Sequence, residues 1–360
     1  MSTLYKYISK NFLIGISICY LSMSAIIFLA DLVEHTRRVG SKEVDFSVLL
    51  TMTSLHFLPL NYEVLPFIVL FGSFGAFHYL NRHSELVIVR SAGYSIWQTL
   101  FFPLIISVLL GVFFIGFLNP LSSSLSKKYE EMEYRYLKGS TKMLSISIEG
   151  MWFRQADTLG QSVIHAQEVT DEGKRLKKVI IFKYDSENQF SERLDAEEAK
   201  LMKNYWQLDY VLKTNLENKR EYYENLKYPT KLTHEDIKES FSSPKTMSFW
   251  DLPKFIRILE DSGFKALKHK LYLYELLTLP LILCSMVIIA AVCTGNLKHT
   301  SRTSFAIISC VIVGFLVFFF LDLSEALGAS GTIPPFFAAW APPTIVTLLG
   351  TVVLLHYADG

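Results

Sequence analysis

Two short segments carry residue types that occur in hydrolytic sites. HEDIK at 234–238 begins like the helix of a zinc protease, and EGKR at 172–175 contains the lysine of a phosphate-binding loop. Lys238 stands where the second zinc-binding histidine would be needed, and the loop lacks its first glycine and its Ser or Thr. GxSxG, the motif of a nucleophilic serine, does not occur. The sequence therefore predicts a non-enzymatic chain with no cofactor and no resident metal.

Three acidic residues lie in or beside apolar runs. Asp322 and Glu325 stand at the end of one run, and Glu63 lies between Pro59 and Pro66. An ionisable group inside a membrane often serves as a relay, whereas one at a helix end needs no function. The simpler interpretation, a helix end near the membrane surface, is favoured for all three, and their roles stay open.

The segment NRHSELVIVRSAGYS at 81–95 separates two long apolar runs and is too polar to lie in lipid. It predicts a short helix with Ser84 as its N-cap, Glu85 in its first turn and Gly93 at its end. An ordinary loop is the alternative. A permease driven by a cytoplasmic ATPase needs such a stiff element to transmit closure, and a secondary transporter does not. The residues expected to make this contact are Arg82, Ser84, Glu85, Leu86, Val89 and Arg90.

These residues must be positioned by membrane helices. The chain has 360 residues, of which 51% are hydrophobic, and its mean hydropathy is +0.29. A helix needs about 20 apolar residues to cross a bilayer. Six segments meet that need, the second after a break at PLNYEVLP. They are 12–30, 64–80, 96–118, 276–297, 303–321 and 336–355.

The distribution of Lys and Arg near the ends of these spans predicts the orientation, because cytoplasmic loops are enriched in them. If the N-terminus is cytoplasmic, six lie on the cytoplasmic side and three on the other. Both termini are then cytoplasmic, and the polar segment after the third span lies outside. The six are Lys6, Lys10, Arg82, Arg90, Lys298 and Arg302; the three are Arg37, Arg38 and Lys42.

The polar segment predicts a separate β domain. Residues 121–275 hold 51 of the 69 charged residues. Stretches between about 140 and 245 alternate with period two, as in half-buried antiparallel strands. In 205–213, one face would carry Trp206, Leu208, Tyr210 and Leu212, with Val211 as the exception. A helix is predicted over Ser248–Asp261, with Ser248 as its N-cap. The domains are thus 1–120 with three spans, 121–270 with the β domain and connecting helix, and 271–360 with three spans.

Four motifs in this arrangement resemble a known family. They are DLVEHTRRVG at 31–40, RHSELVIVRSAG at 82–93, GMWFR at 150–154 and GTIPPFFAAWAP at 331–342. The chain resembles, from end to end, the LptF/LptG (YjgP/YjgQ) permeases of the lipopolysaccharide exporter, and the LptG branch more closely. The segment at 82–93 is the most specific of the four, because its charge pattern, its position and its terminal glycine all agree.

The resemblance implies a bacterial (Gram-negative) inner-membrane permease that extracts lipopolysaccharide. Its partners would be a homologous LptF-like permease, an LptB-like ATPase dimer and an LptC-like protein. It implies that Glu85 makes the charged contact with the ATPase. It also implies that the first span of one permease and the fifth of its partner gate a central cavity. The β domain would be jellyroll-like, periplasmic and open along one side, and it would pass lipopolysaccharide onward.

The resemblance also gives the outer cations and the sheet a lipid-binding interpretation. Arg37, Arg38 and Lys42 would bind lipid A phosphates by charge-assisted hydrogen bonds, or else they simply reach toward any anionic lipid. His35 departs from the residue type expected beside the arginine pair. An apolar row in the β domain would form the lipid path, although a closed core is an equally good interpretation. The row is Val163, Ile164, Val179, Ile181, Trp206, Leu208, Tyr210 and Leu212.

Two other functions remain as alternatives. A mechanotransmitting ABC subunit of the MacB or FtsX kind places its extracellular domain after the first span, whereas here it follows the third. A membrane-anchored periplasmic binding protein predicts one or two spans rather than six.

Overall fold

The computed structural model describes most of the chain, and its internal contacts divide it into two compact units. The helical unit comprises residues 1–133, 248–250 and 267–360, and the sheet unit comprises 134–247 and 251–266. The described residues are 2–40, 44–138, 144–147, 150–157, 160–170, 174–185, 189–215, 219–230, 243–261, 265–295 and 303–359.

Within the described residues, six helical segments are long and apolar enough to cross a membrane, which confirms the predicted number. The third, Ile96–Leu137, is built from four helical pieces in direct succession, of which the second, η1 (Phe114–Leu118), and the fourth, η2 (Tyr134–Lys138), are π-helices. The membrane segments are α1 (Ser2–Val39), α2 (Phe46–Arg82), α4 (Ile96–Phe113) with η1, α5 (Asn119–Glu133) and η2, α8 (Leu267–Gly295), α9 (Thr303–Ala329) and α10 (Pro335–Asp359).

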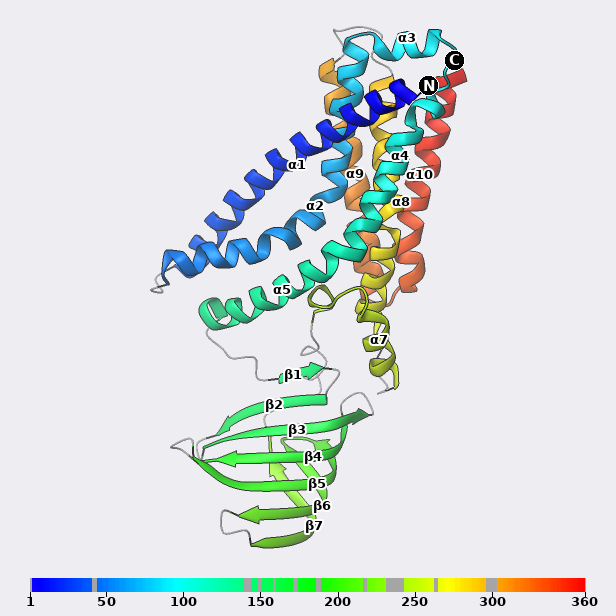
Figure 1. The fold of residues 1–360 in the computed structure, drawn as a ribbon. Helices are drawn as coiled ribbons and strands as arrows, with labels where there is room; N and C mark the ends of the chain where they lie inside the picture. Colours follow the sequence, from blue (N-terminus) through cyan, green and yellow to red (C-terminus); the bar gives the residue numbers. More distant parts are fainter. Residues whose placement is uncertain are drawn as a thin grey trace. The chain divides into compact units, whose positions relative to one another are not determined.

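The predicted break before the second span is wrong. Helix α2 runs without interruption through Pro59 and Pro66, and Figure 1 shows it bending. A proline inside a helix removes one hydrogen bond and kinks the axis. Membrane helices tolerate this because neighbouring groups can satisfy the freed carbonyl. Helix α5 likewise continues the third segment to Glu133 and belongs to the helical unit.

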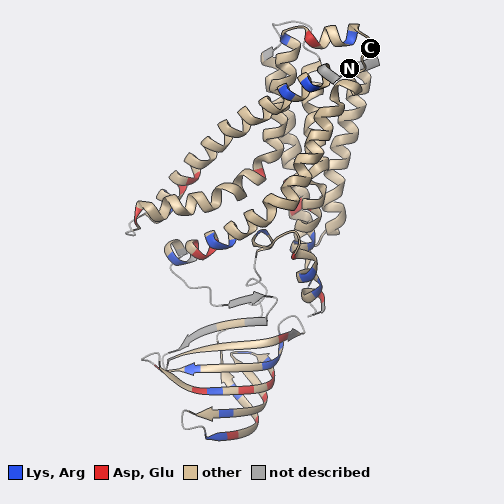
Figure 2. Cartoon of the chain, viewed as in Figure 1, with Lys and Arg blue, Asp and Glu red and all other residues tan. Residues whose placement is uncertain are grey.

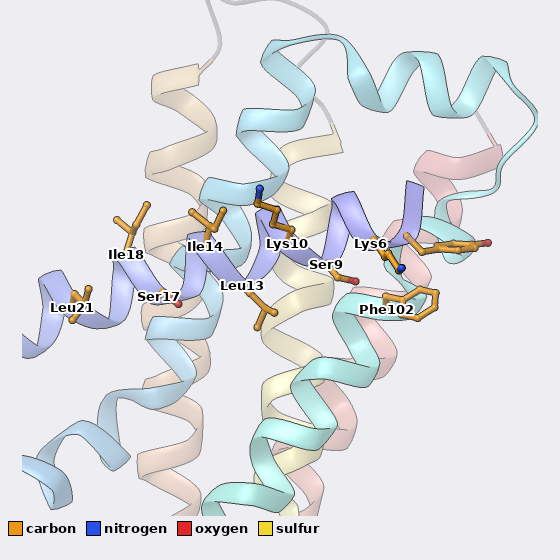
Figure 3. Close-up of a pocket in the computed structure, with 10 residues that line it drawn as sticks. Lys6, Ser9, Lys10, Leu13, Ile14, Ser17, Ile18, Leu21 and Phe102 are labelled. Atoms are coloured by element: carbon orange, nitrogen blue, oxygen red, sulfur yellow. The ribbon is translucent and has the colours of Figure 1, made fainter. Parts of the chain in front are cut away.

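Charged residues are sparse along the apolar helices of the helical unit and dense on the strands and α5 (Figure 2). One face of α1 is left uncovered by the described residues. Together with Phe102 of α4 it lines an open groove of about 760 Å³, whose other residues all come from α1 (Figure 3). Ile18 and Leu21 in this groove are 63% and 68% exposed. Such a large apolar surface requires lipid or another protein to cover it.

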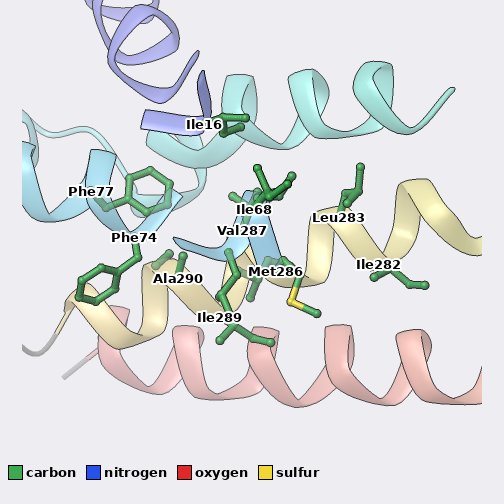
Figure 4. Close-up of a cluster of buried hydrophobic side chains, with 14 of the residues drawn as sticks. Ile16, Ile68, Phe74, Phe77, Ile282, Leu283, Met286, Val287, Ile289 and Ala290 are labelled. Carbon is green, nitrogen blue, oxygen red and sulfur yellow. The ribbon is translucent and has the colours of Figure 1, made fainter. Parts of the chain in front are cut away.

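The core of the helical unit forms around α8. In its most apolar 18-residue stretch, 67% is buried. Leu283, Val287 and Met286 of α8 pack with Ile68 of α2 and other buried side chains (Figure 4). Two contacts depend on glycine. A Cβ at Gly111 of α4 would lie 2.7 Å from the Cα of Pro280, and one at Gly72 would lie 2.7 Å from the Cα of Ile16. Small residues allow helix backbones to approach closely in membranes.

The sheet unit contains seven described strands, each antiparallel to its neighbours in the chain, so the predicted antiparallel sheet is confirmed. Within the described strands, β1 and β7 are the two edges. The strands are β1 (Leu144–Ser147), β2 (Gly150–Asp157), β3 (Gly160–Thr170), β4 (Arg175–Tyr184), β5 (Phe190–Met202), β6 (Tyr205–Asn215) and β7 (Arg220–Pro229).

A line of irregular residues crosses the sheet from β3 to β7. The strand pairing skips one residue in each of these strands, and all five are exposed. Two of them have left-handed backbone, with φ of 51° and 56°. We call these residues the interrupted row; they are Gln167, Lys178, Glu197, Tyr210 and Glu224.

The interrupted row reverses which side chains face inward. Buried side chains lie three residues apart across it, as with Leu208 and Val211, instead of two apart. The predicted apolar face of β6 is therefore wrong in its second half. Tyr210 is 55% exposed, Val211 is buried, and Leu212 is only half-buried. A non-extended residue within a strand changes the alternation, as a β-bulge does.

The predicted connecting helix begins later than expected. Helix α7 spans Leu252–Asp261, so Ser248 is not its N-cap, and the main-chain NH of Phe255 bonds to the carbonyl of Asp251 at 3.0 Å. Phe255, like Ile256 and Leu259, is buried. Trp250 precedes the helix and donates its indole NH to the Gly116 carbonyl at 3.3 Å.

A cluster of charges joins three strands at Glu192. Its carboxylate lies 2.9 Å from the ammonium of Lys183 on β4 and 2.8 Å from that of Lys213 on β6. Burial acts to raise the pKa of Glu192, but the hydrogen bonds from Lys213 and Lys183 outweigh burial and lower that pKa below its usual value. The ionised form of Glu192 therefore stabilises the folded sheet.

This cluster gives a pH prediction. Because the pKa of Glu192 is lower in the folded chain, its contribution is complete above the unfolded value of about 4.3 and disappears as the pH falls through the folded value. Hydrogen exchange of the sheet amides should show stability falling below that pH, and Glu192→Gln should weaken the dependence. Glu224→Gln, at an exposed position, is the matched control. Equal pH dependence in both variants would contradict the assignment.

Candidate functional site

The segment between the second and third membrane helices forms a short helix, α3 (Glu85–Ser91), as predicted. Its end at Gly93 is also as predicted: Gly93 has φ +88°, and the NH groups of Gly93 and Tyr94 bond back to Arg90 and Val89. Ser84 occupies the N-cap position, but the prediction that its side chain caps the helix is wrong. Its backbone is left-handed, with φ 59°, and its hydroxyl makes no capping hydrogen bond.

Glu85 is held against the start of α1. Its Oε1 accepts a hydrogen bond from the Tyr7 hydroxyl at 3.0 Å. Its Oε2 is buried and has no hydrogen-bond partner among the described residues. A small pocket of about 220 Å³ beside it is lined by Leu4, Tyr7, Ile8, Leu80, Glu85, Leu86, Ile88 and Val89. The position of α3 is therefore linked to the N-terminal turns of α1.

The apolar side chains of α3 divide differently from the prediction. Leu86 packs against the core of the helical unit, and Val89 lines the small pocket. The exposed apolar residues are Val87 and Ile88, at 59% and 63%. Arg82 and Arg90, also exposed, flank them at the two ends of the segment. The outer surface of α3 is thus an apolar pair between two cations.

The arginine pair at the end of α1 is neutralised within the chain. Arg37 donates two hydrogen bonds of 2.9 Å to Glu34, and Arg38 donates one of 2.8 Å to the same carboxylate. Arg38 also reaches Glu133 of α5 at 3.4 Å. The side chain of Arg37 is nevertheless 77% exposed. Lys42, the third predicted cation, lies outside the described residues.

Most of the predicted lipid path is filled by packing. Five of its eight side chains are at most 2% exposed: Ile164, Val179, Ile181, Trp206 and Leu208. Val163 and Leu212 are half-buried, and Tyr210 faces outward. Val163 pairs with Phe182, and Ile164 pairs with Ile181 on the opposite face. The buried five form the inner face of the sheet in this conformation.

The three acidic residues predicted in or beside apolar runs all have exposed side chains. Asp322 and Glu325 lie in α9, and Glu63 lies in α2 between its two prolines. Glu63 lies inside a continuous helix, so the predicted helix end there is wrong, whereas Asp322 and Glu325 lie near the C-terminal end of α9, as predicted. The structure brings none of them into the group of residues around α3.

One cluster was not predicted. Asp31 and His35 of α1, His56 of α2 and Tyr129 of α5 meet in one group, which we call the Asp31 cluster. The spacing of Asp31 and His35, four residues apart on one helix face, is visible in the sequence. His56 could not be added from the sequence, because only the packing of α2 against α1 brings it there.

The comparisons with known proteins cover nearly the whole chain. The family model for the lipopolysaccharide export system permease LptF/LptG matches residues 6–356. The chain is 24% identical to the lipopolysaccharide export system permease protein LptG of Haemophilus influenzae, and the alignment covers 97% of each protein. The fold agrees with that of a non-catalytic transmembrane subunit. It has six apolar helices, a short helix between the second and third, and an antiparallel sheet after the third. The chain therefore belongs to the LptF/LptG family of lipopolysaccharide export system permeases.

Proposed function

We propose that this chain works with a homologous LptF-like permease and a cytoplasmic LptB-like ATPase dimer. The chain would extract lipopolysaccharide from the inner membrane and pass it through its sheet unit to an LptC-like protein. The observation that carries this proposal is the family match over residues 6–356. The three functional regions are 1–120 with the coupling segment at 82–93, 121–270 and 271–360.

The outer surface of α3 supports its role as the coupling element. Val87 and Ile88 together offer an apolar contact, and Arg82 and Arg90 offer charge at either end. Glu85 is the residue that we expect to make the charged contact with the ATPase. Because Glu85 also bonds to Tyr7, a displacement of α3 would reach α1 directly.

The uncovered faces of two helices support pairing with a homologous permease. In α1, only 11% of the most apolar 18-residue stretch is buried within the chain. In α9, the fifth membrane helix, 22% of the corresponding stretch is buried. The groove along α1 offers a helix-sized apolar surface. In the proposed heterodimer, α1 of one permease lies against the fifth helix of the other, and these contacts gate the central cavity.

The charge bias at the helix ends supports a cytoplasmic N-terminus and C-terminus. Lys6 and Lys10 begin α1, and Arg82 and Arg90 flank α3, whereas Arg37 and Arg38 end α1. In this orientation the sheet unit is periplasmic. Lipid would then travel from the end of α1 toward the sheet.

The packed inner face of the sheet limits how lipid can pass. Its acyl chains must stay dry, at about 25 cal/mol for each Å² of apolar surface. Ile181 and Leu208 have no exposed surface in this conformation. We propose that the sheet opens to expose the inner face during transfer, and that the five buried residues then line the path.

Reconstitution tests the proposal. The chain, its LptF-like neighbour and the ATPase would be placed in liposomes that contain lipopolysaccharide, and transfer to a soluble acceptor sheet domain would be followed with ATP. We expect ATP-dependent transfer that requires all three proteins. Transfer by the ATPase and the neighbour alone, at the full rate, would remove this chain from the pathway.

A prediction concerns the arginine pair. Arg37→Glu with Arg38→Glu should weaken lipopolysaccharide binding by roughly 1.5–3 kcal/mol for each charged hydrogen bond lost. The measurement is photocrosslinking from a probe at position 36, where Thr36 is exposed.

The matched control for that prediction is Glu34→Gln. Glu34 currently accepts hydrogen bonds from both arginines, so removing its charge should free them for phosphate and raise the crosslinking yield. If the pair merely reaches toward any anionic lipid, both variants should crosslink to lipopolysaccharide as the native chain does.

A further inference from the structure

The Asp31 cluster joins three helices of the helical unit. His56 Nδ1 lies 2.9 Å from Asp31 Oδ1, and His35 Nδ1 lies 3.3 Å from Asp31 Oδ2. The side chains of Asp31, His35 and His56 are 10%, 2% and 25% exposed. Two imidazoles and a carboxylate thus converge in a mostly buried place, to which only His56 gives partial access.

The ligand atoms of these three residues have the spacing of a metal site. One nitrogen or oxygen from each lies within 4.8 Å of the others. A tetrahedral zinc ion with bonds of about 2.0–2.2 Å holds its ligand atoms about 3.3–3.6 Å apart. Of the two separations from Asp31, the 3.3 Å to His35 lies at the short end of that range, and the 2.9 Å to His56 would have to lengthen by a few tenths of an ångström on binding.

One oxygen of the Asp31 carboxylate lacks a hydrogen bond, although His35 Nδ1 lies 3.3 Å from it. The ring nitrogen Nδ1 of His35 makes its hydrogen bond to the main-chain oxygen of Asp31, at 2.8 Å. Asp31 Oδ2 is therefore buried without a hydrogen-bond partner among the described residues. A buried carboxylate oxygen is costly unless a hydrogen bond or a cation compensates it. A metal ion at this place would supply that compensation.

Tyr129 of α5 orients both imidazoles. Its hydroxyl lies 3.0 Å from His35 Nε2, and its ring stacks on that of His56, with centroids 4.2 Å apart and planes 4° apart. In metal sites, the second nitrogen of a ligating histidine is usually held by a hydrogen-bond acceptor outside the ligand set. To bind a metal through Nδ1, His35 would give up the Nδ1 proton and its hydrogen bond to the Asp31 main-chain oxygen, and its Nε2–H would then donate to Tyr129.

We propose that Asp31, His35 and His56 form a binding site for a divalent transition metal ion of the zinc class. Two imidazoles favour such an ion over Mg²⁺ or Ca²⁺, which prefer oxygen ligands. Three protein ligands leave a fourth position for water or a ligand oxygen. The site departs from the sequence analysis, which predicted no metal. A bound ion would fasten α1 to α2 near the ends that the segment at 40–45 connects.

Metal titration of the full chain tests the proposal. The chain would be purified with its partner subunits by a histidine-free tag, stripped with a chelator and titrated with Co²⁺. We expect ligand-field absorption that saturates at a single equivalent per chain and is displaced by Zn²⁺. Asp31→Asn, His35→Gln and His56→Gln should each weaken binding by at least roughly 100-fold. These substitutions keep hydrogen-bonding groups, so the helices should still pack.

The control variant is His83→Gln, which removes an exposed histidine from the loop before α3. It should bind Co²⁺ as the native chain does. A second measurement needs no variant: Zn²⁺ should protect His56 from diethyl pyrocarbonate, as read by mass spectrometry. The proposal is overturned if the native chain takes up no more Co²⁺ than His56→Gln, or if Zn²⁺ leaves the modification of His56 unchanged.

Discussion

Replacing Glu85 with lysine is expected to abolish ATP-driven export while the membrane helices stay folded. The substitution reverses the charge in the first turn of α3 and loses the hydrogen bond from Tyr7. Breaking one side of a buried charged contact between proteins costs about 2–5 kcal/mol, so co-purification of the ATPase should fall by at least about 30-fold. The measurements are ATPase yield on the purified permease and transport in liposomes.

Two milder variants separate the possible causes. Glu85→Gln keeps an acceptor for Tyr7 and loses the charge, whereas Tyr7→Phe keeps the charge and loses the internal hydrogen bond. If Glu85 contacts the ATPase, Glu85→Gln should be the more damaging of the two. If Tyr7→Phe alone matches the lysine variant, Glu85 acts by holding α3 on α1. Normal ATPase yield and transport in Glu85→Lys would end the coupling role altogether.

Trp206→Ala is expected to destabilise the sheet unit by about 3–5 kcal/mol, the range for truncating a buried aromatic residue. Trp206 is 1% exposed and lies on β6 between β5 and β7. Its indole nitrogen is buried without a partner among the described residues, so its removal also relieves a small cost. The loss of stability should therefore lie near the lower limit of this range. Hydrogen exchange of the β5 and β6 amides in the full chain measures it.

Tyr210→Ala is the matched control on the same strand. Its side chain is 55% exposed, so its removal should change stability by no more than about 0.5 kcal/mol. Strict alternation along β6 would place both residues on one face and predict similar losses. Equal destabilisation by the two variants would thus contradict the reversed alternation at the interrupted row.

The membrane helices were predictable because apolar length alone decides them. What failed was the interpretation of proline: PLNYEVLP looked like a break, but α2 continues through Pro59 and Pro66. A water-soluble helix of that composition would lose too much stability at each proline to continue through both. In the membrane, breaking the helix would expose backbone groups to lipid at a still greater cost.

The positions of the strands could be predicted from the sequence, but the side chains that point to the inner face of the sheet could not. Alternation correctly put Trp206 and Leu208 on the inner face. It failed at Tyr210, because the left-handed residue there has no sequence marker: tyrosine is not a residue that normally favours φ 56°. The left-handed backbone at Tyr210 belongs to a row at which the pairing of five strands is skipped, and this row is visible only in the structure.

Among the site residues, local contacts were predictable and long-range ones were not. Gly93 and its helix end follow from the segment 81–95 itself. The bond between Tyr7 and Glu85 spans 78 residues, and that between Arg38 and Glu133 spans 95. The same limit hid the Asp31 cluster, since His56 reaches it only when α2 packs on α1.

The interrupted row also governs how the sheet can deform. Strands resist bending where their ladder is regular, and the ladder is skipped at the same level in five strands. We therefore expect the sheet to bend most easily along this row, with the strand pairing on either side of the row intact. Because the residues of the interrupted row are exposed, substitutions that alter the bending of the sheet would fall on its outer surface, away from the buried residues that we propose as the lipid path.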